Sequence, residues 1–67
     1  MRKKIYLATI INNGKVSTML VDGYSKPSVR KKLTDFFMKN NEIEDFNKFD
    51  IYLKRVIENG GEYYDAE

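Results

Sequence analysis

The chain has 67 residues, no cysteine and no histidine, and 12 basic and 10 acidic side chains that give a formal net charge of +2. Packing, or association with another subunit, must stabilise so small a domain, because disulfides and a Cys/His zinc site are both excluded. The commonest general base and the thiol nucleophile are missing as well. We therefore expect one non-enzymatic domain over residues 1–67, with no catalytic residue, cofactor, metal or small-molecule ligand.

Residues 4–22 are predicted to form a β-hairpin. Two runs rich in Ile, Leu, Val and Thr flank Asn13-Gly14, a pair that readily adopts the positive φ angles of a type I′ turn. A two-residue loop places Leu7 opposite Leu20 and Thr9 opposite Thr18. Because side chains alternate along a strand, the hairpin has two distinct faces. One carries Ile5, Leu7, Thr9, Ile11, Val16, Thr18 and Leu20, and the other carries Tyr6, Ala8, Ile10, Ser17, Met19 and Val21.

An amphipathic helix is predicted over residues 26–40. Ser25 is a suitable N-cap and Pro27 lies in the first turn, where its missing N–H is not needed. One helical stripe follows at spacings of i, i+4, i+7 and i+8, formed by Val29, Leu33, Phe36 and Phe37. The helix is expected to end at Asn40-Asn41 in a left-handed cap.

Residues 51–60 repeat part of residues 5–14, with Ile-Tyr-Leu, a later Ile and Asn-Gly in the same places. Coincidence is one explanation, since the chain is rich in these residues. We favour a second strand of the same kind, followed by an Asn59-Gly60 turn into a short final strand, so that 50–65 forms a strand or hairpin. Residues 41–49 are interpreted as a connector, with a short helical turn as the alternative because Ile43, Phe46 and Phe49 recur every three residues.

This element order predicts an α+β fold of type ββαββ, or ββαβ if the last strand does not form. With the helix crossing over the sheet, the third strand lies antiparallel beside the first, which gives an antiparallel sheet of order 2-1-3-4 with the amphipathic helix packed on one face. The two Ile-Tyr-Leu segments would then occupy the central strands, related by an approximate two-fold axis.

The helix is expected to cover the more aliphatic set of strand residues, although Arg55 fits that face only if it lies near the rim. That set is Ile5, Leu7, Ile11, Val16, Leu20, Ile51, Leu53 and Ile57. The opposite face would then show Tyr6, Ala8, Ile10, Met19, Val21, Tyr52, Lys54, Val56 and Tyr63. A sheet face in water normally alternates to polar residues, so a contiguous apolar face indicates an interaction site.

The first functional hypothesis is a protein-binding module that acts as a regulator or inhibitor of a larger protein, or associates with a second copy of itself as a homodimer. Its predicted interface is Tyr6, Ile10, Met19, Tyr52, Lys54, Val56 and Tyr63, because Tyr and Met supply contact area at low entropic cost. Such economy is typical of phage and mobile-element accessory proteins. On this hypothesis, replacing Tyr6 and Tyr52 by Ala abolishes binding at little cost in stability.

The alternative hypothesis is a nucleic-acid-binding domain in which tyrosines stack on bases and Lys4, Arg30, Lys31 and Lys54 contact phosphates. Residues 1–41 hold nine basic and two acidic side chains, whereas residues 42–67 hold three basic and eight acidic ones. This asymmetry indicates either an electrostatic footprint or two halves that neutralise each other. The small total charge favours a protein partner over nucleic acid.

The expected location is the cytoplasm, with no membrane association. No apolar run approaches the roughly 20 residues of a membrane span, and the basic residues 1–4 lead into a predicted strand rather than a signal-peptide core. Glu42, Glu44 and Asp45 lack the spacing of a calcium loop and are interpreted as a solvated acidic turn.

Overall fold

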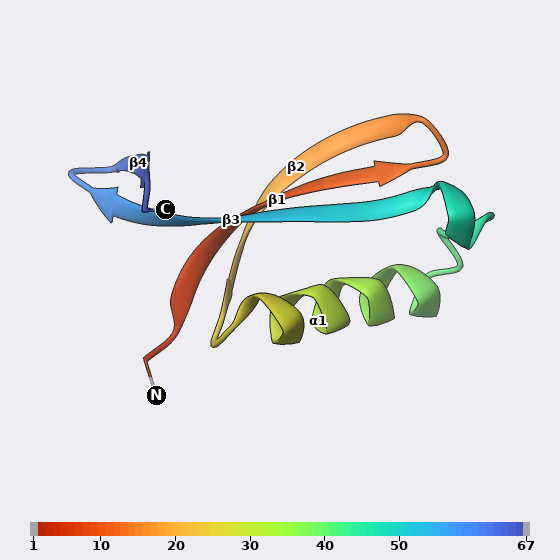
Figure 1. Ribbon diagram of the computed structural model, residues 1–67, viewed down its shortest axis with the longest axis horizontal. Helices are drawn as coiled ribbons and strands as arrows, with labels where there is room; N and C mark the ends of the chain where they lie inside the picture. The colour runs from red at the N-terminus through yellow and green to blue at the C-terminus, as the bar shows by residue number, and fades with distance from the viewer. Residues whose placement is uncertain (1, 67) are drawn as a thin grey trace.

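The computed structural model describes residues 2–66, which form a four-stranded antiparallel sheet with one helix beneath it (Figure 1). The elements follow in the order β1 Lys4–Asn12, β2 Lys15–Gly23, α1 Lys26–Lys39, the 3₁₀ turn η1 Phe46–Lys48, β3 Phe49–Asn59 and β4 Glu62–Asp65. The strand order is β2-β1-β3-β4. The predicted α+β fold and its strand order are confirmed, and the short helical turn in the connector does form.

The β1–β2 hairpin has the predicted turn and register. Asn13 and Gly14 have φ angles of 54° and 85°, as a type I′ turn requires. Leu7 pairs with Leu20 along a continuous, bulge-free ladder that runs from Lys4–Gly23 to Asn12–Lys15. The two-residue turn therefore determines which side chains share a face.

Helix α1 begins with a reciprocal cap and ends in a left-handed residue. The Ser25 hydroxyl accepts a hydrogen bond from the Ser28 N–H at 3.3 Å, and the Ser28 hydroxyl accepts one from the Ser25 N–H at 3.2 Å. These bonds satisfy two backbone donors that the helix cannot pair internally. At the other end Asn41 has a φ of 54°, so the predicted cap region is confirmed.

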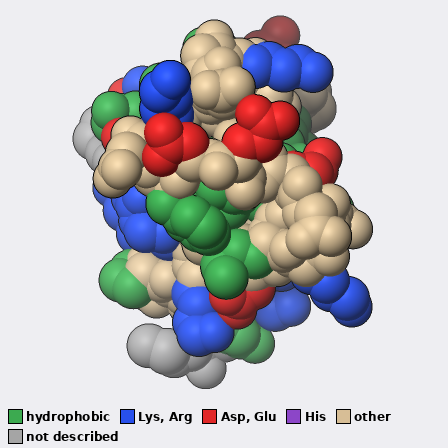
Figure 2. Space-filling model, turned by 90° about the vertical axis from the view of Figure 1, so that its right-hand side faces the viewer, with side chains coloured by type: hydrophobic (Ala, Val, Ile, Leu, Met, Phe, Trp, Pro, Cys, Tyr) green, Lys and Arg blue, Asp and Glu red, His purple; other side chains and the backbone are tan. Residues whose placement is uncertain are grey.

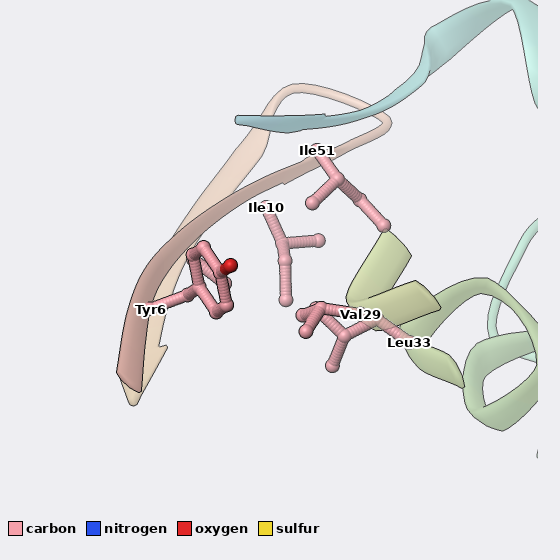
Figure 3. Close-up of a cluster of buried hydrophobic side chains, with 6 residues drawn as sticks. Tyr6, Ile10, Val29, Leu33 and Ile51 are labelled. Carbon is pink, nitrogen blue, oxygen red and sulfur yellow. The ribbon is translucent and has the colours of Figure 1, made fainter. Parts of the chain in front are cut away.

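The core lies between α1 and the sheet face that carries the even-numbered residues of β1 (Figure 3). The buried cluster comprises Tyr6, Ala8, Ile10, Val29, Leu33 and Ile51. The expectation that the helix covers Ile5, Leu7, Ile11, Val16 and Leu20 is therefore wrong. The helix packs on this face because two of its residues are small. Ala8 is fully buried and Gly23 has no side chain, so both let the helix approach the strands closely.

The pairing of β1 with β3 does not place the two Ile-Tyr-Leu segments symmetrically. Ile10 pairs with Ile51 and Thr9 with Tyr52, and directly paired residues share a face. Ile51 and Leu53 consequently face the helix, as predicted. Tyr6 also faces the helix whereas Tyr52 lies on the opposite face, so the expected two-fold relation between the segments does not hold.

The helical stripe is narrower than predicted. Val29 and Leu33 are buried, and Phe37 packs on the core, with its ring centroid 5.5 Å from that of Phe49. Phe36 is 54% exposed and contacts only the edge of the Phe37 ring among the aromatic side chains of residues 2–66. The prediction that Phe36 faces the sheet is wrong: the residues that face it are Val29, Leu33 and Phe37, at spacings of i, i+4 and i+8.

The β3–β4 hairpin extends beyond the helix (Figure 1). Its turn residues are Gly60 and Gly61, with φ angles of 64° and 85°, and Asn59 pairs with Glu62. The turn thus lies one residue later than predicted. Ile57, which was expected under the helix, is exposed here because α1 does not reach this end. Arg55 is exposed as well, although its pairing with Tyr6 places it on the helix side of the sheet.

Candidate functional site: the open sheet face

The sheet face opposite α1, called here the open face, is not covered by any element of residues 2–66. Its apolar and aromatic members come from all four strands. They are Ile5, Leu7, Ile11, Val16, Leu20, Tyr52, Val56 and Tyr63. Val16 and Tyr52 are the most exposed of them, at 62% and 57%. Helix α1 packs on a single side of the sheet, so the other apolar face stays in contact with water.

The open face is organised in rows across the strands. Thr18, Thr9 and Tyr52 form the central row, and Leu20, Leu7 and Lys54 form the next one. Lys54 makes an ion pair with Asp65 of β4, with Nζ and Oδ2 2.9 Å apart. The two rows are therefore mainly apolar or hydroxyl-bearing, with Lys54 inside the face and the carboxylates of Asp22, Asp50 and Asp65 toward its ends.

Tyr52 lies beside the carboxylate of Asp50 on the open face. The carboxylate accepts a hydrogen bond from the phenol and repels the phenolate, and both effects raise the pKa of Tyr52 above its ordinary value. Because the pKa is raised in the folded state, this contribution to stability is present below the unfolded-state pKa and is lost as the pH rises through the folded-state pKa.

We predict that Asp50→Asn lowers the pKa of Tyr52 toward about 10. The amide oxygen of Asn can still accept the hydrogen bond that Asp50 Oδ1 receives from the Ile51 N–H at 2.9 Å, so the strand is expected to persist. A pH titration of the Tyr52 ring carbon by NMR measures the change. An unchanged Tyr52 pKa in this variant would contradict the assigned interaction.

The residues predicted for the interface divide between the two sides of the sheet. Tyr6 and Ile10 are in the core, at 3% and 2% exposure, and cannot contact a partner in the folded chain. Met19 is exposed but on the helix side, opposite Ala8. Those that lie on the open face are Tyr52, Lys54, Tyr63 and Val56, the last of them buried within the sheet surface.

Sequence reasoning missed the hairpin's contribution to this face, namely Leu7, Ile11, Val16 and Leu20. A signal for it was present in the sequence. Ala8 and Gly23 share the other face of the hairpin, and small side chains mark the side on which a helix backbone can approach. Counting aliphatic residues overlooked this steric criterion.

The basic residues of the nucleic-acid hypothesis lie on different surfaces. Lys4 and Lys54 point to opposite faces of the sheet by their register. Lys31 pairs with Asp35 at 2.8 Å on the helix, and the Arg30 guanidinium donates to the Ile51 carbonyl at 2.6 Å. The fold does not bring these four side chains together into one groove.

A second exposed surface lies at the end of the molecule formed by the β1–β2 turn, η1 and the end of α1 (Figure 2). Two of its acidic side chains, those of Glu44 and Asp45, accept hydrogen bonds from neighbouring residues. Glu44 accepts a hydrogen bond from the Asn13 side chain at 3.4 Å, and Asp45 accepts one from the Asn47 N–H at 2.9 Å. The Asn13 N–H also donates to the Lys48 carbonyl at 2.9 Å. These contacts hold the connector against the hairpin turn.

Neither surface contains a grouping of metal ligands: within residues 2–66, no three Asp or Glu side chains are placed to hold a metal ion. Among the same residues, no helix combines the length and apolar character that a membrane crossing needs. The fold and site define a small α+β protein with a helix-covered sheet face and an open apolar one. Comparison with protein-family models, curated protein sequences and solved structures found no match.

Proposed function

We propose that this protein is a non-enzymatic binding module that acts on a larger protein through its open face. The observation that supports the proposal is the exposure of Val16, Leu20, Tyr52 and Tyr63 on one face that no part of residues 2–66 covers. Contiguous apolar surface of this kind on a small domain usually marks a binding site. A module of this size acts by covering part of its target's surface. This is why we propose the role of a regulator or inhibitor.

Tyrosine and aliphatic residues on a rigid sheet suit this task. The strands hold the side chains before binding, so less conformational entropy is lost when the partner arrives. Tyr52 and Tyr63 each combine a large apolar ring with a hydroxyl that can find a partner at a polar rim, and Tyr is enriched among residues that dominate binding energy. The expected target surface is apolar at its centre, with a polar margin facing Lys54 and Asp65.

A matched pair of double variants tests the proposal. Tyr52→Ala with Tyr63→Ala removes two tyrosines from the open face, whereas Tyr24→Ala with Tyr64→Ala removes two tyrosines of similar exposure from other surfaces. Wild type and both variants are used as bait in source-cell extract, and the affinity of the captured protein is then measured with purified components. We expect at least about a tenfold loss of affinity for the first variant only.

Two outcomes would contradict the proposal. One is equal binding by both double variants, which would place the contact surface elsewhere. The other is capture of nucleic acid, with binding of labelled oligonucleotides that weakens steeply as salt is raised, because phosphate contacts release counterions. Thermal melts of both variants show whether the fold has survived the substitutions.

A further inference from the structure

The sheet has two edges, and they differ in how far other groups cover their backbone. β2 is one edge along its whole length, because β1 is the only strand beside it in the described part of the chain, residues 2–66. At the other edge β4 covers β3 only from Val56 to Asn59, which leaves residues 49–55 of β3 beside no strand. An unpaired edge presents backbone N–H and C=O groups that can hydrogen-bond to a further strand.

The uncovered part of the β3 edge is closed by other contacts. The Arg30 guanidinium donates to the outward carbonyl of Ile51, and the Asp50 carboxylate accepts from the outward N–H of the same residue. Farther along, the Ala66 N–H donates to the Arg55 carbonyl at 3.0 Å. These contacts leave little room for another strand at this edge.

The β2 edge has no such protection. In a two-residue hairpin the flanking pair, here Asn12 and Lys15, is hydrogen-bonded, and hydrogen-bonded pairs then alternate along the ladder. The backbone groups of Val16, Thr18 and Leu20 consequently point outward. Within residues 2–66, no hydrogen bond reaches them from outside the ladder; the one such contact on β2 is that of the Lys32 ammonium to the Asp22 carbonyl, at 3.4 Å.

The side chains in the central segment of β2, residues 16–21 between Lys15 and Asp22, do not protect the edge either. Natural edge strands are commonly protected by Lys, Pro, a bulge or an inward charge. Residues 16–21 contain no Lys, no Pro and no other charged side chain. The ladder with β1 is continuous, so there is no bulge. Every residue from Lys15 to Leu20 is exposed, including Ser17 and Met19 on the helix side.

We infer that a second copy of this chain pairs with the β2 edge, so that two β2 strands run antiparallel about a two-fold axis and join two sheets into one of eight strands. The inference depends on the edge and does not depend on the proposed function of the open face. The main-chain groups require an extended strand as the occupant, and the uncharged segment of one copy meets that of the other without like-charge repulsion.

One register makes the pairing self-complementary. A two-fold axis normal to the sheet pairs residues that share a face, and only Val16, Thr18 and Leu20 have outward backbone groups in the uncharged segment. With the axis at Thr18, this residue pairs with Thr18 of the second copy, and Val16 pairs with Leu20 of the second copy. Both pairs lie on the open face, where they place exposed aliphatic side chains against each other.

The same contrast between edges limits the assembly to two copies. A two-fold contact through β2 uses that edge of each chain. On the other side of the sheet the β3 edge is closed by Arg30 and Asp50, and the outer edge of β4 is only 4 residues long and carries Glu62 and Asp65. The contact is therefore isologous and does not propagate into a fibre. One pair of strands buries an area at the low end for specific interfaces, so we expect a micromolar dissociation constant.

Sedimentation equilibrium over roughly 5 to 500 μM, the range that brackets such a constant, tests this inference. The wild-type chain should shift from monomer to dimer and no further. Thr18→Lys should reduce association at least tenfold, because two ammonium groups then face each other across the axis, whereas the control Thr18→Val keeps the backbone groups and a β-branched side chain. Circular dichroism checks that Thr18→Lys still folds.

A cross-linking measurement does not rely on loss of association. The chain contains no cysteine, so Thr18→Cys introduces a single thiol at the axis, and the facing residues of an antiparallel pair lie within disulfide range. Mild oxidation should give a covalent dimer. In the control Lys15→Cys the two thiols would lie six residues apart along the strands, about 20 Å, and should not join.

A wild-type chain that stays monomeric at the highest concentration would overturn the inference. A dimer that Thr18→Lys leaves intact, or equal cross-linking of both cysteine variants, would also overturn it, by placing the contact elsewhere. Growth beyond the dimer would overturn the closure at the β3 edge. Each result is independent of the Tyr52 and Tyr63 variants, which report on the larger partner.

Discussion

Tyr6→Ala is expected to destabilise the protein by about 3–5 kcal/mol, the range for deleting a buried aromatic side chain, whereas Tyr52→Ala is expected to cost less than about 1 kcal/mol. The two tyrosines occupy the same place in identical Ile-Tyr-Leu segments. Tyr6 is 3% exposed beneath α1, and its removal leaves a cavity beside Ile10 and Val29. Tyr52 is largely in water, where its ring loses few contacts.

The size of the first effect decides whether the chain folds. A domain of this length has a free energy of unfolding of roughly 3–10 kcal/mol, so Tyr6→Ala is expected to remove much or all of that stability. Urea unfolding monitored by circular dichroism provides the free energies of wild type and both variants. A larger loss for Tyr52→Ala than for Tyr6→Ala would mean that the sheet faces are assigned the wrong way round, and similar losses would contradict the difference in burial between the two tyrosines.

Gly23→Ala is expected to destabilise the protein by about 3 kcal/mol, at the upper end for overpacking a core. A Cβ atom at this position would lie 2.3 Å from Cγ2 of Val29. Val29 is 1% exposed, and a β-branched side chain in a helix has essentially one rotamer available, so the methyl group cannot turn away. Either the helix must shift from the sheet or the β2–α1 turn must distort.

A double-mutant cycle isolates this contact. Val29→Ala removes the methyl groups that clash, and we expect Gly23→Ala to cost at least about 1 kcal/mol less in that background than in wild type, a coupling within the range for contacting residues. Chemical unfolding of the four proteins gives the coupling free energy. Additive effects would show that the cost of Gly23→Ala does not arise from the contact with the Val29 side chain.

The local elements were predictable because local interactions decide them. The φ angles of Asn13 and Gly14 fix the turn and, with it, the register of β1 against β2. The Ser25 hydroxyl, which accepts from the Ser28 N–H, and the Asn41 N–H, which donates to the Met38 carbonyl, mark the ends of α1 through contacts between near neighbours in the chain. Even the strand order followed from the element order, since a helix that crosses over the sheet returns the chain beside β1.

The composition of the candidate site was only partly predictable. Tyr52, Lys54 and Tyr63 were placed on the uncovered side, and this placement agrees with the register of β3. Tyr6 and Ile10 were placed there too, although they form the core. The error came from the relation of β1 to β3, where residues of opposite parity share a face, and no short-range pattern encodes that offset.

By itself the sequence determined the turns, the helix, the strand order and an excess of apolar side chains over what one helix can cover. Only the tertiary structure decided which face the helix takes, because the choice depends on whether a backbone can approach Ala8 and Gly23 rather than on the number of aliphatic residues. It also decided which sheet edge is closed, since Arg30 reaches the Ile51 carbonyl 21 residues away in the chain. Contacts over such separations depend on how the elements pack, and the hydrophobic periodicity within each element does not predict them.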